Sequence, residues 1–382
     1  MSYEAVAVSD ESTVVAEFVP ESIARDAGYQ SEAGLEAAFI KRLESQAYAH
    51  LRIASEAELV ANLRVQLEAL NAITFSDAEW ERFFATCVSG ANDGILEKTA
   101  RLQEDHIQIL KRDDGTTRNV YLIDKRNIHN NRLQVINQYE AEGRRASSFD
   151  VTILVNGLPM VHVELKRRGV DIREAFNQIN RYQRDSFWAG SGLFEYVQLF
   201  VISNGTLTKY YSNTVRDGHL AERRNRRTRQ QTSNSFSFTS WWADAKNRPI
   251  TDLTGFTRTF FAKHALLNIL TKYCVFDVDR KLLVMRAYQI VAAERILQRI
   301  GTSTNHKQLG SAAAGRCRSH ERYGHHEDPA AGLPLRQGQR ARRQEADGNR
   351  QTGGVPRALP GAGLTGGAIA PPTPLPPAEI AP

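Results

Sequence analysis

Apolar residues in the first third of the chain recur at helical spacing in three segments. Segments 31–48, 55–71 and 76–88 place apolar residues three or four positions apart, which is the pattern of an amphipathic helix. Each segment opens with a serine and an acidic first turn. A serine hydroxyl accepts hydrogen bonds from the free N–H groups at a helix start, and acidic side chains favour the same end. The sequence therefore predicts three helices in this part of the chain.

Between residues 117 and 213 the apolar pattern changes toward alternation, which indicates strands. The predicted strands are 119–123, 132–139, 149–155, 160–166, 196–203 and 207–212. A helix over 171–186 interrupts them, with Asp171 and Glu174 spaced as a capping box. Helical patterns return at 254–273 and 286–300. This order of helices and strands predicts a mixed α/β domain.

Two carboxylates and a lysine occupy neighbouring strands of this predicted sheet. Glu164 and Lys166 are two apart and share one face of their strand, while Asp150 lies on the strand before it. The strands are joined around Asn156-Gly157, a hairpin signal. A two-residue loop would place Asp150 opposite residue 163, on the wrong face from Glu164. We therefore expect a loop of three or five residues, which brings the three side chains together.

A carboxylate pair with an ammonium group has a clear chemical use. Carboxylates bind Mg²⁺ through a few oxygens and leave waters around it, and the bound metal can polarise a phosphodiester and activate a water. Lys166 could position that water or offset developing charge. The alternative interpretation is an ordinary solvated strand face. Gln178 and Tyr182, four apart on the next helix, share one helical face, which routine helix packing would also explain.

The net charge of +6 and a pI near 9.2 would favour a nucleic-acid partner. This argument depends on where in the chain the excess positive charge lies. Residues 301–382 carry ten basic and six acidic residues, so +4 lies there and only +2 in the first 300 residues. Cys87, Cys274 and Cys317 are too scattered for a disulfide framework and are typical of a reducing cytosol. We find no apolar run long enough to span a membrane and no export signal, so we expect a cytoplasmic protein.

The composition changes sharply after residue 300. Residues 301–382 contain 13 of the 26 glycines and 10 of the 13 prolines, with Tyr323 as the single aromatic residue. From about residue 311 there is no helical or strand period, so this segment cannot offset the entropy of ordering. Two explanations are a natural disordered tail and an out-of-frame translation of GC-rich coding sequence.

The motif residues carry a resemblance to a known family. Asp150, Glu164-Leu165-Lys166 and Gln178-x-x-x-Tyr182 resemble the PD-(D/E)xK nuclease motif with its QxxxY extension, although Phe149 replaces the motif's proline. The surrounding text, including VHVELKRRG, QINRYQRDSFW and SFSFTSWWAD, resembles the restriction (R) subunit of type I restriction endonucleases from about residue 25 to 310.

The resemblance implies a restriction-endonuclease-like core in which a mixed sheet is flanked by helices. It implies that Asp150 and Glu164 are Mg²⁺ ligands, that Lys166 is the catalytic lysine, and that Gln178 and Tyr182 support engagement of double-stranded DNA. Glu36 matches an acidic position that some of these nucleases add to the metal site, and the alternative interpretation is an exposed helix carboxylate. The implied partners are the modification and specificity subunits of the complex.

Members of this family continue into an ATP-driven motor. Arg286, Tyr288 and Gln289 resemble an adenine-contacting motif, with Ala287 in place of a usual proline. The phosphate-binding loop G-x-x-x-x-G-K-[ST] does not follow, and the resemblance stops where the composition changes. We therefore predict a lost ATPase and a frameshifted or truncated reading frame. The expected organisation is a flexible N-terminus (1–24), a nuclease domain (25–250), a helical linker with the start of the motor (251–310) and a disordered tail (311–382).

Two functions remain open at this stage. The first is Mg²⁺-dependent cleavage of DNA through Asp150, Glu164 and Lys166. The second is an inactive, truncated subunit that only binds DNA or partner subunits. Among other candidates, a basic run at 223–229 could follow a phosphate backbone or be a solvated loop. We expect Trp241 and Trp242 to pack in a core or subunit contact, and His162 to be a structural neighbour of the site.

Overall fold

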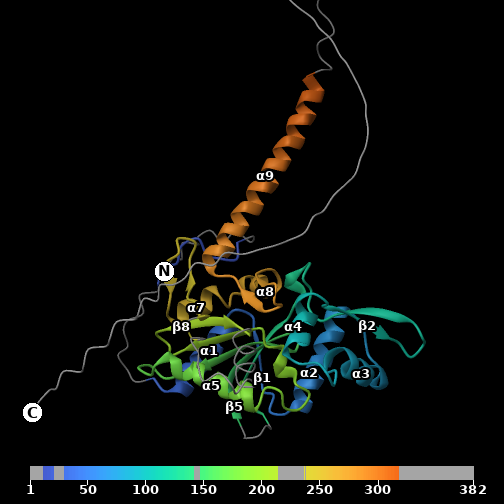
Figure 1. The fold of residues 1–382 in the computed structure, drawn as a ribbon, viewed down its shortest axis with the longest axis vertical. Coiled ribbons are helices and arrows are strands. Elements are labelled where there is room, and N and C mark those ends of the chain that lie inside the picture. Colours follow the sequence, from blue (N-terminus) through green and yellow to red (C-terminus); the bar gives the residue numbers. More distant parts are fainter. Residues whose placement is uncertain (1–11, 21–29, 142–146, 214–235, 237, 318–382) are drawn as a thin grey trace, which may run out of the picture. The chain divides into compact units, whose positions relative to one another are not determined.

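The computed structural model describes residues 12–20, 30–141, 147–213, 236 and 238–317 of the 382-residue chain. All of them fall within one compact unit, in which helices surround a central sheet (Figure 1). Most of the predicted flexible N-terminus, the basic run at 223–229 and the tail beyond residue 317 lie outside the described residues.

The three predicted N-terminal helices are confirmed, and a fourth follows them. Their bounds are α1 (Glu32–Glu44), α2 (Glu56–Asn71), α3 (Asp77–Phe83) and α4 (Ile95–Gln103). The hydroxyls of Ser31, Ser55 and Ser76 accept hydrogen bonds from backbone N–H groups in the first turns of α1, α2 and α3. After α3 the chain continues as the π-helix η1 (Phe84–Val88), so the segment 76–88 is helical with a change in hydrogen bonding.

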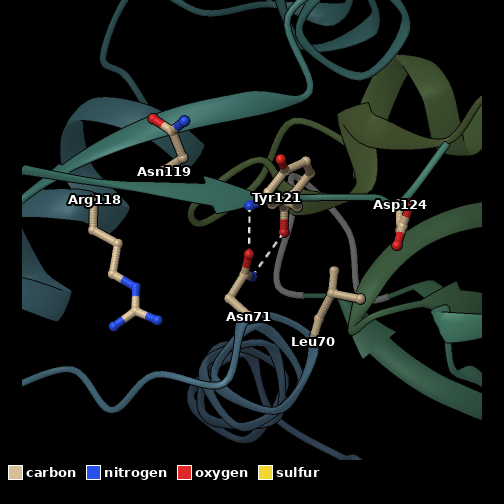
Figure 2. Close-up of a pocket in the computed structure, with 6 residues that line it drawn as sticks. All are labelled: Leu70, Asn71, Arg118, Asn119, Tyr121 and Asp124. Carbon is tan, nitrogen blue, oxygen red and sulfur yellow. Dashed lines mark hydrogen bonds between the residues drawn. The ribbon is translucent and has the colours of Figure 1, made fainter. Parts of the chain in front are cut away.

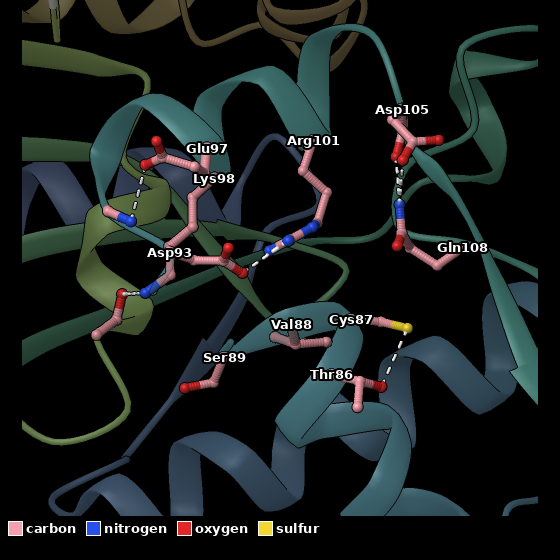
Figure 3. A network of polar contacts seen from close by, with 12 residues as sticks. Thr86, Cys87, Val88, Ser89, Asp93, Glu97, Lys98, Arg101, Asp105 and Gln108 are labelled. Carbon is pink, nitrogen blue, oxygen red and sulfur yellow. Dashed lines mark hydrogen bonds and ion pairs between the residues drawn. The ribbon is translucent and has the colours of Figure 1, made fainter. Parts of the chain in front are cut away.

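A buried ion pair attaches α4 to the 3₁₀ helix η3 (Leu193–Tyr196), and a second pair joins α4 to the residue Asp93 that precedes it. The Lys98 side chain is 3% exposed, and its Nζ donates to Glu195 Oε2 at 2.9 Å and to the Gly192 carbonyl at 3.0 Å. Arg101 faces Asp93, and the two atoms Nη2 and Oδ2 are 2.6 Å apart (Figure 3). Because each buried charge has an opposite charge at hydrogen-bond distance, this network is a structural connection.

A six-stranded mixed sheet forms the centre of the molecule, in the order β1-β4-β5-β6-β7-β8. The strands are β1 (Ala49–Leu51), β4 (Leu133–Ala141), β5 (Ser147–Val155), β6 (Leu158–Leu165), β7 (Leu199–Ser203) and β8 (Thr208–Ser212). Pairs β1–β4 and β6–β7 are parallel and the other neighbours are antiparallel. The mixed α/β prediction is therefore confirmed.

Shorter strands form separate two-stranded sheets. They are β2 (Ile107–Lys111) with β3 (Thr117–Tyr121), β9 (Trp242–Ala243) with β10 (Pro249–Ile250), and β11 (Cys274–Phe276) with β12 (Leu282–Val284). The predicted strand 119–123 thus belongs to the β2–β3 hairpin and not to the main sheet. The sixth main strand is β1, which the sequence pattern did not indicate because only three residues pair.

Helices lie on both faces of the sheet, α5 (Ile172–Asp185) on one and α7 (Leu253–Thr259) on the other. Helix α8 (Lys263–Lys272) follows α7, and the long helix α9 (Ala287–Cys317) extends away from the sheet (Figure 1). Successive residues of β8 point to opposite faces: the Tyr211 ring packs 5.3 Å from Phe176 of α5, and the Tyr210 ring packs 5.0 Å from Phe260, next to α7. Helix α9 includes residues 311–317, so these seven residues are helical where we expected irregular chain.

The hairpin between β5 and β6 corrects one sequence prediction. Val155 pairs with Leu158, so the loop is the two-residue Asn156-Gly157 turn and not the longer loop that we expected. The register then shifts: Leu154 pairs with Pro159, but Ile153 pairs with Val161. Met160 is therefore the extra residue of a β-bulge. The β-bulge provides the one-residue shift in register that we had expected from a longer loop.

The turn itself is held firmly in the core. Asn156 and Gly157 both have positive φ, 51° and 84°, as a tight hairpin turn requires. The Asn156 side chain is 1% exposed and hydrogen-bonds to Arg132 N and Asn131 Oδ1. A Cβ atom on Gly157 would lie 2.7 Å from Leu63 Cα on α2. The turn is thus fixed both by its backbone conformation and by close packing.

We expect Gly157→Ala to lower the free energy of unfolding by about 3 kcal/mol, because it combines backbone strain with overpacking. Gly115→Ala is the matched control, since Gly115 has a similar φ of 82° but open space around its Cβ position. That variant should lose only about 1 kcal/mol. Urea unfolding of both variants measures the difference, and equal losses would contradict the packing argument.

Candidate active site

The bulged hairpin brings Asp150 next to the end of β6. Continuing the register beyond the Val151–Val163 pair places Asp150 level with Glu164. Asp150 Oδ2 accepts a hydrogen bond from the backbone N–H of Leu165 at 2.8 Å. Asp150 is half-buried and Glu164 is fully buried. The predicted carboxylate pair is therefore assembled at the carboxyl end of β6.

Lys166 follows directly after β6 and completes the group. Its Nζ lies 3.0 Å from Glu164 Oε1 and 2.9 Å from the Leu165 carbonyl oxygen. The Lys166 side chain is only 11% exposed. The ammonium is thus directed at Glu164 rather than at solvent.

Burial dominates the electrostatics of this carboxylate pair. It raises the pKa of Asp150 to about 7, with a further contribution from the neighbouring Glu164 charge. Burial also raises the pKa of Glu164 to about 7, although Lys166 acts in the opposite direction. One lysine therefore does not fully compensate two buried carboxylates. A site that disfavours its own negative charge is suited to an additional cation.

The donor atoms fit a magnesium ion. Glu164 Oε2 is buried and makes no hydrogen bond to the described residues, with His162 Nε2 3.6 Å away, so this carboxylate oxygen is not committed to a protein hydrogen bond. The described part of the chain contains no group of three or more His, Cys, Asp or Glu side chains placed to hold a metal. Two carboxylates that leave several positions to water are what Mg²⁺ accepts, whereas structural zinc requires four protein ligands.

Gln178 and Tyr182 lie together on α5, as their spacing predicts. Gln178 Nε2 donates to the Tyr182 hydroxyl, and that hydroxyl donates to the Ser148 carbonyl oxygen at 2.8 Å. The Tyr182 ring packs edge-on against Phe149 at 5.0 Å. The pair therefore holds α5 to the start of β5, immediately before Asp150.

Glu36 is not the exposed helix carboxylate of the alternative interpretation, because it is only 8% exposed. Its two oxygens accept hydrogen bonds, both of 2.6 Å, from the side chains of Asn137 and Gln138 on β4. Consecutive strand residues normally point to opposite faces. Gln138 has a φ of 52°, which breaks the alternation and lets both amides reach Glu36. Glu36 thus braces the part of β4 level with Asp150.

Two residues near the site have contacts that the sequence did not assign. Glu32, in the first turn of α1, lies 3.9 Å from Lys166 Nζ and accepts a hydrogen bond from Arg167 N. His162 is fully buried, with Nδ1 3.2 Å from Thr152 Oγ1 and Nε2 3.6 Å from Glu164 Oε2. His162 is a buried neighbour of Glu164, as we expected. The sequence indicates only that Glu32 lies at the start of a helix, and it gives no sign that Glu32 lies near Lys166.

The remaining candidate residues lie away from this group. Arg286, Tyr288 and Gln289 are exposed at the start of α9, where Gln289 Oε1 accepts a hydrogen bond from Arg286 N. Trp242 is fully buried against Phe260, as predicted for core packing. None of the described helices is long and apolar enough to cross a membrane.

A separate hollow of about 400 Å³ lies between α2 and β3 (Figure 2). It is lined by Leu70, Asn71, Arg118, Asn119, Tyr121 and Asp124. Asn71 uses its side chain to bind both the N–H and the carbonyl of Tyr121. This amide is therefore committed to joining α2 and β3, and no member of the carboxylate group lines the hollow.

The fold and site define a mixed α/β protein with two carboxylates and a lysine at the end of its central sheet. Residues 9–219 match the family described as Type I restriction enzyme R protein N terminus (HSDR_N). The chain belongs to this family.

Curated relatives agree with this assignment. The Type I restriction enzyme EcoprrI endonuclease subunit of Escherichia coli is 48% identical over 282 residues, which is 74% of this chain and 86% of that protein. The SsaAORF53P endonuclease subunit of Staphylococcus saprophyticus is 36% identical, and the SauCOLORF180P endonuclease subunit of Staphylococcus aureus strain COL is 34% identical. For these two relatives the match covers 72% of this chain but only 28% of theirs.

Proposed function

We propose that this chain carries the PD-(D/E)xK nuclease domain of an R subunit and cleaves DNA phosphodiester bonds with Mg²⁺. One observation carries the proposal: the bulged β5–β6 hairpin places Asp150 beside Glu164, with Lys166 Nζ 3.0 Å from Glu164 Oε1. The names of the relatives, which are endonuclease subunits of type I restriction enzymes, support the same activity.

Each site residue has a role in this proposal. Asp150 and Glu164 would hold the Mg²⁺ ion, which when bound supplies polarisation of the phosphodiester and activation of water. Lys166 offsets the negative charge that develops on the phosphate, because its ammonium is fixed by Glu164 and the Leu165 carbonyl. Gln178 and Tyr182 keep β5 in place and support engagement of DNA. Glu36 acts through β4 and not as a direct ligand.

The same proposal extends to partners and to ATP. Modification and specificity subunits would supply sequence recognition, in a cytoplasmic complex on double-stranded DNA. Arg286, Tyr288 and Gln289 would be the remnant of an adenine contact, without a phosphate-binding loop in this chain. The match covers 28% of the length of the staphylococcal relatives. Because this chain has no phosphate-binding loop, we expect it to have no ATPase activity.

Plasmid cleavage tests the proposal. We expect the purified 382-residue chain to nick or linearise supercoiled plasmid in the presence of Mg²⁺ or Mn²⁺. Asp150→Ala should reduce the rate by at least about 100-fold, since one of two metal-binding carboxylates is lost. Gel electrophoresis with and without EDTA measures the rate.

Asp279→Ala, an exposed carboxylate on the surface, is the control and should cleave as the wild type does. Equal cleavage by wild type and Asp150→Ala would indicate a contaminating nuclease and reject the assignment of the site. If the wild type binds DNA but does not cleave it with either metal, the alternative function of an inactive docking subunit would replace this one.

A further inference from the structure

Arg173 and Lys209 both pack against aromatic rings at the edge of the sheet next to α5. The Arg173 guanidinium carbon lies 4.7 Å from the centre of the Phe236 ring, and Lys209 Nζ lies 4.9 Å from the same centre. Lys209 Nζ also lies 4.6 Å from the Trp241 ring centre. Contacts of this kind fix the positions of cationic groups without neutralising them.

The positive charge of this pair is not compensated within the described part of the chain. Neither Arg173 nor Lys209 forms an ion pair with any described acidic residue. Asp171 is close in sequence, but its carboxylate caps α5 by accepting a hydrogen bond from Arg173 N. Burial and the charge of Arg173 both lower the pKa of Lys209. An anion placed between the two cations would therefore be bound favourably.

The pair also has a defined position relative to the carboxylates. Glu164 on β6 pairs with Ile202 on β7, and Ile202 pairs with Lys209 on β8. Directly paired residues point to the same face of a sheet. Lys209 therefore lies on the face and at the end of the sheet where Glu164 lies, two strand spacings or about 10 Å away.

We infer that Arg173 and Lys209, held on Phe236 and Trp241, form a binding site for a backbone phosphate of the DNA strand being cleaved. This inference rests on the proposed nuclease function and adds a subsite to it. One strand of DNA carries a phosphate every 3.4 Å or so along the helix axis. A separation of about 10 Å is therefore short enough for phosphates a few nucleotides apart on the same strand to occupy the two positions.

The site differs from a general positive surface because its cations are held in place. Free lysines and arginines lose side-chain entropy on binding, whereas cations already stacked on rings lose less. Phosphate contacts of this type position DNA without reading its sequence. The subsite would thus align the duplex with the carboxylates and contribute no recognition.

DNA binding without divalent metal tests the inference separately from cleavage. The full chain and its Arg173→Gln/Lys209→Gln variant are titrated onto a fluorescein-labelled duplex in EDTA, with anisotropy recorded over a series of salt concentrations. We expect the variant to bind about tenfold more weakly. The magnitude of the slope of log K against log salt should fall by about 1, because one phosphate is no longer neutralised.

The matched control is Lys111→Gln/Arg118→Gln, which removes the same charge from exposed positions on the β2–β3 hairpin. An equal loss in the control would overturn the inference, because the effect would then be one of net charge. The Arg173→Lys/Lys209→Arg variant should recover most of the affinity. If it does not, or if the first variant binds as wild type, the phosphate site is rejected.

Added ATP distinguishes binding of a DNA backbone phosphate from binding of a nucleotide phosphate. At constant ionic strength, ATP should not displace DNA from the wild type. If ATP displaces DNA from the wild type but not from the Arg173→Gln/Lys209→Gln variant, the site binds nucleotide and the DNA assignment is wrong. Plasmid cleavage by the same preparations is scored independently, so a failure of the nuclease proposal is recognised as such.

Discussion

Lys166→Met is expected to abolish DNA cleavage while leaving metal binding intact. The Lys166 ammonium lies 3.0 Å from Glu164 Oε1, and the side chain is 11% exposed. In the variant, no cation from solvent would be held at the same fixed position. Loss of one positioned charge that stabilises a transition state typically lowers the rate by about 10² to 10³-fold. Plasmid cleavage rates and Mn²⁺ titration by electron paramagnetic resonance measure the two properties on the same protein.

The two properties should separate because different residues carry them. Asp150 and Glu164 are unchanged in Lys166→Met, so the Mn²⁺ affinity should be equal to or higher than that of the wild type. Glu164→Gln should instead weaken both binding and cleavage. Lys272→Met, at the end of α8, is the control and should behave as wild type. Cleavage by Lys166→Met at the wild-type rate would remove Lys166 from the mechanism.

Phe149→Ala is expected to lower the free energy of unfolding by about 4 kcal/mol. Phe149 is fully buried, directly before Asp150, and its ring lies within 5.0 Å of the rings of Tyr182, Phe187 and Phe194. Truncation would leave a cavity among stiff rings that cannot collapse to fill it. Urea denaturation followed by circular dichroism measures the loss.

Phe238→Ala provides the comparison, since this ring is 70% exposed and should contribute less than about 0.5 kcal/mol. If Phe149→Ala were as stable as Phe238→Ala, the aromatic cluster would not support the start of β5. Phe149 stands where the PD-(D/E)xK motif, which the sequence resembles, has a proline. In this chain an aromatic side chain provides the rigidity through packing instead.

Local patterns predicted most of the fold because the corresponding interactions are local. The helix starts at Ser31, Ser55 and Ser76 were readable from capping chemistry alone. The strands of the main sheet followed from alternation, except β1. A three-residue strand has too few positions to show any period, and its pairing with β4 depends on residues about 85 positions apart.

The proximity of the three charged side chains was also predictable, but the way the sheet brings them together was not. Residue type and spacing indicated that Asp150, Glu164 and Lys166 lie close to one another, as they do. The bulge at Met160 and the left-handed φ of Gln138 have no local sequence signal. Both result from how the strands pack between helices, which only the assembled sheet determines. The contact between Glu36 and β4 depends on the same irregularity.

The β-bulge at Met160 determines whether residues an even number of positions apart can face each other across the hairpin. Across a plain two-residue turn, facing residues are always separated by an odd number of positions. Asp150 and Glu164 are separated by 14, so they can meet only if one strand holds an unpaired residue. Among relatives that keep the two-residue turn, a separation of 13 or 15 would need no bulge, and a separation of 14 would need one. For those relatives, the number of residues between the two carboxylates indicates from sequence alone whether the hairpin contains an irregular strand.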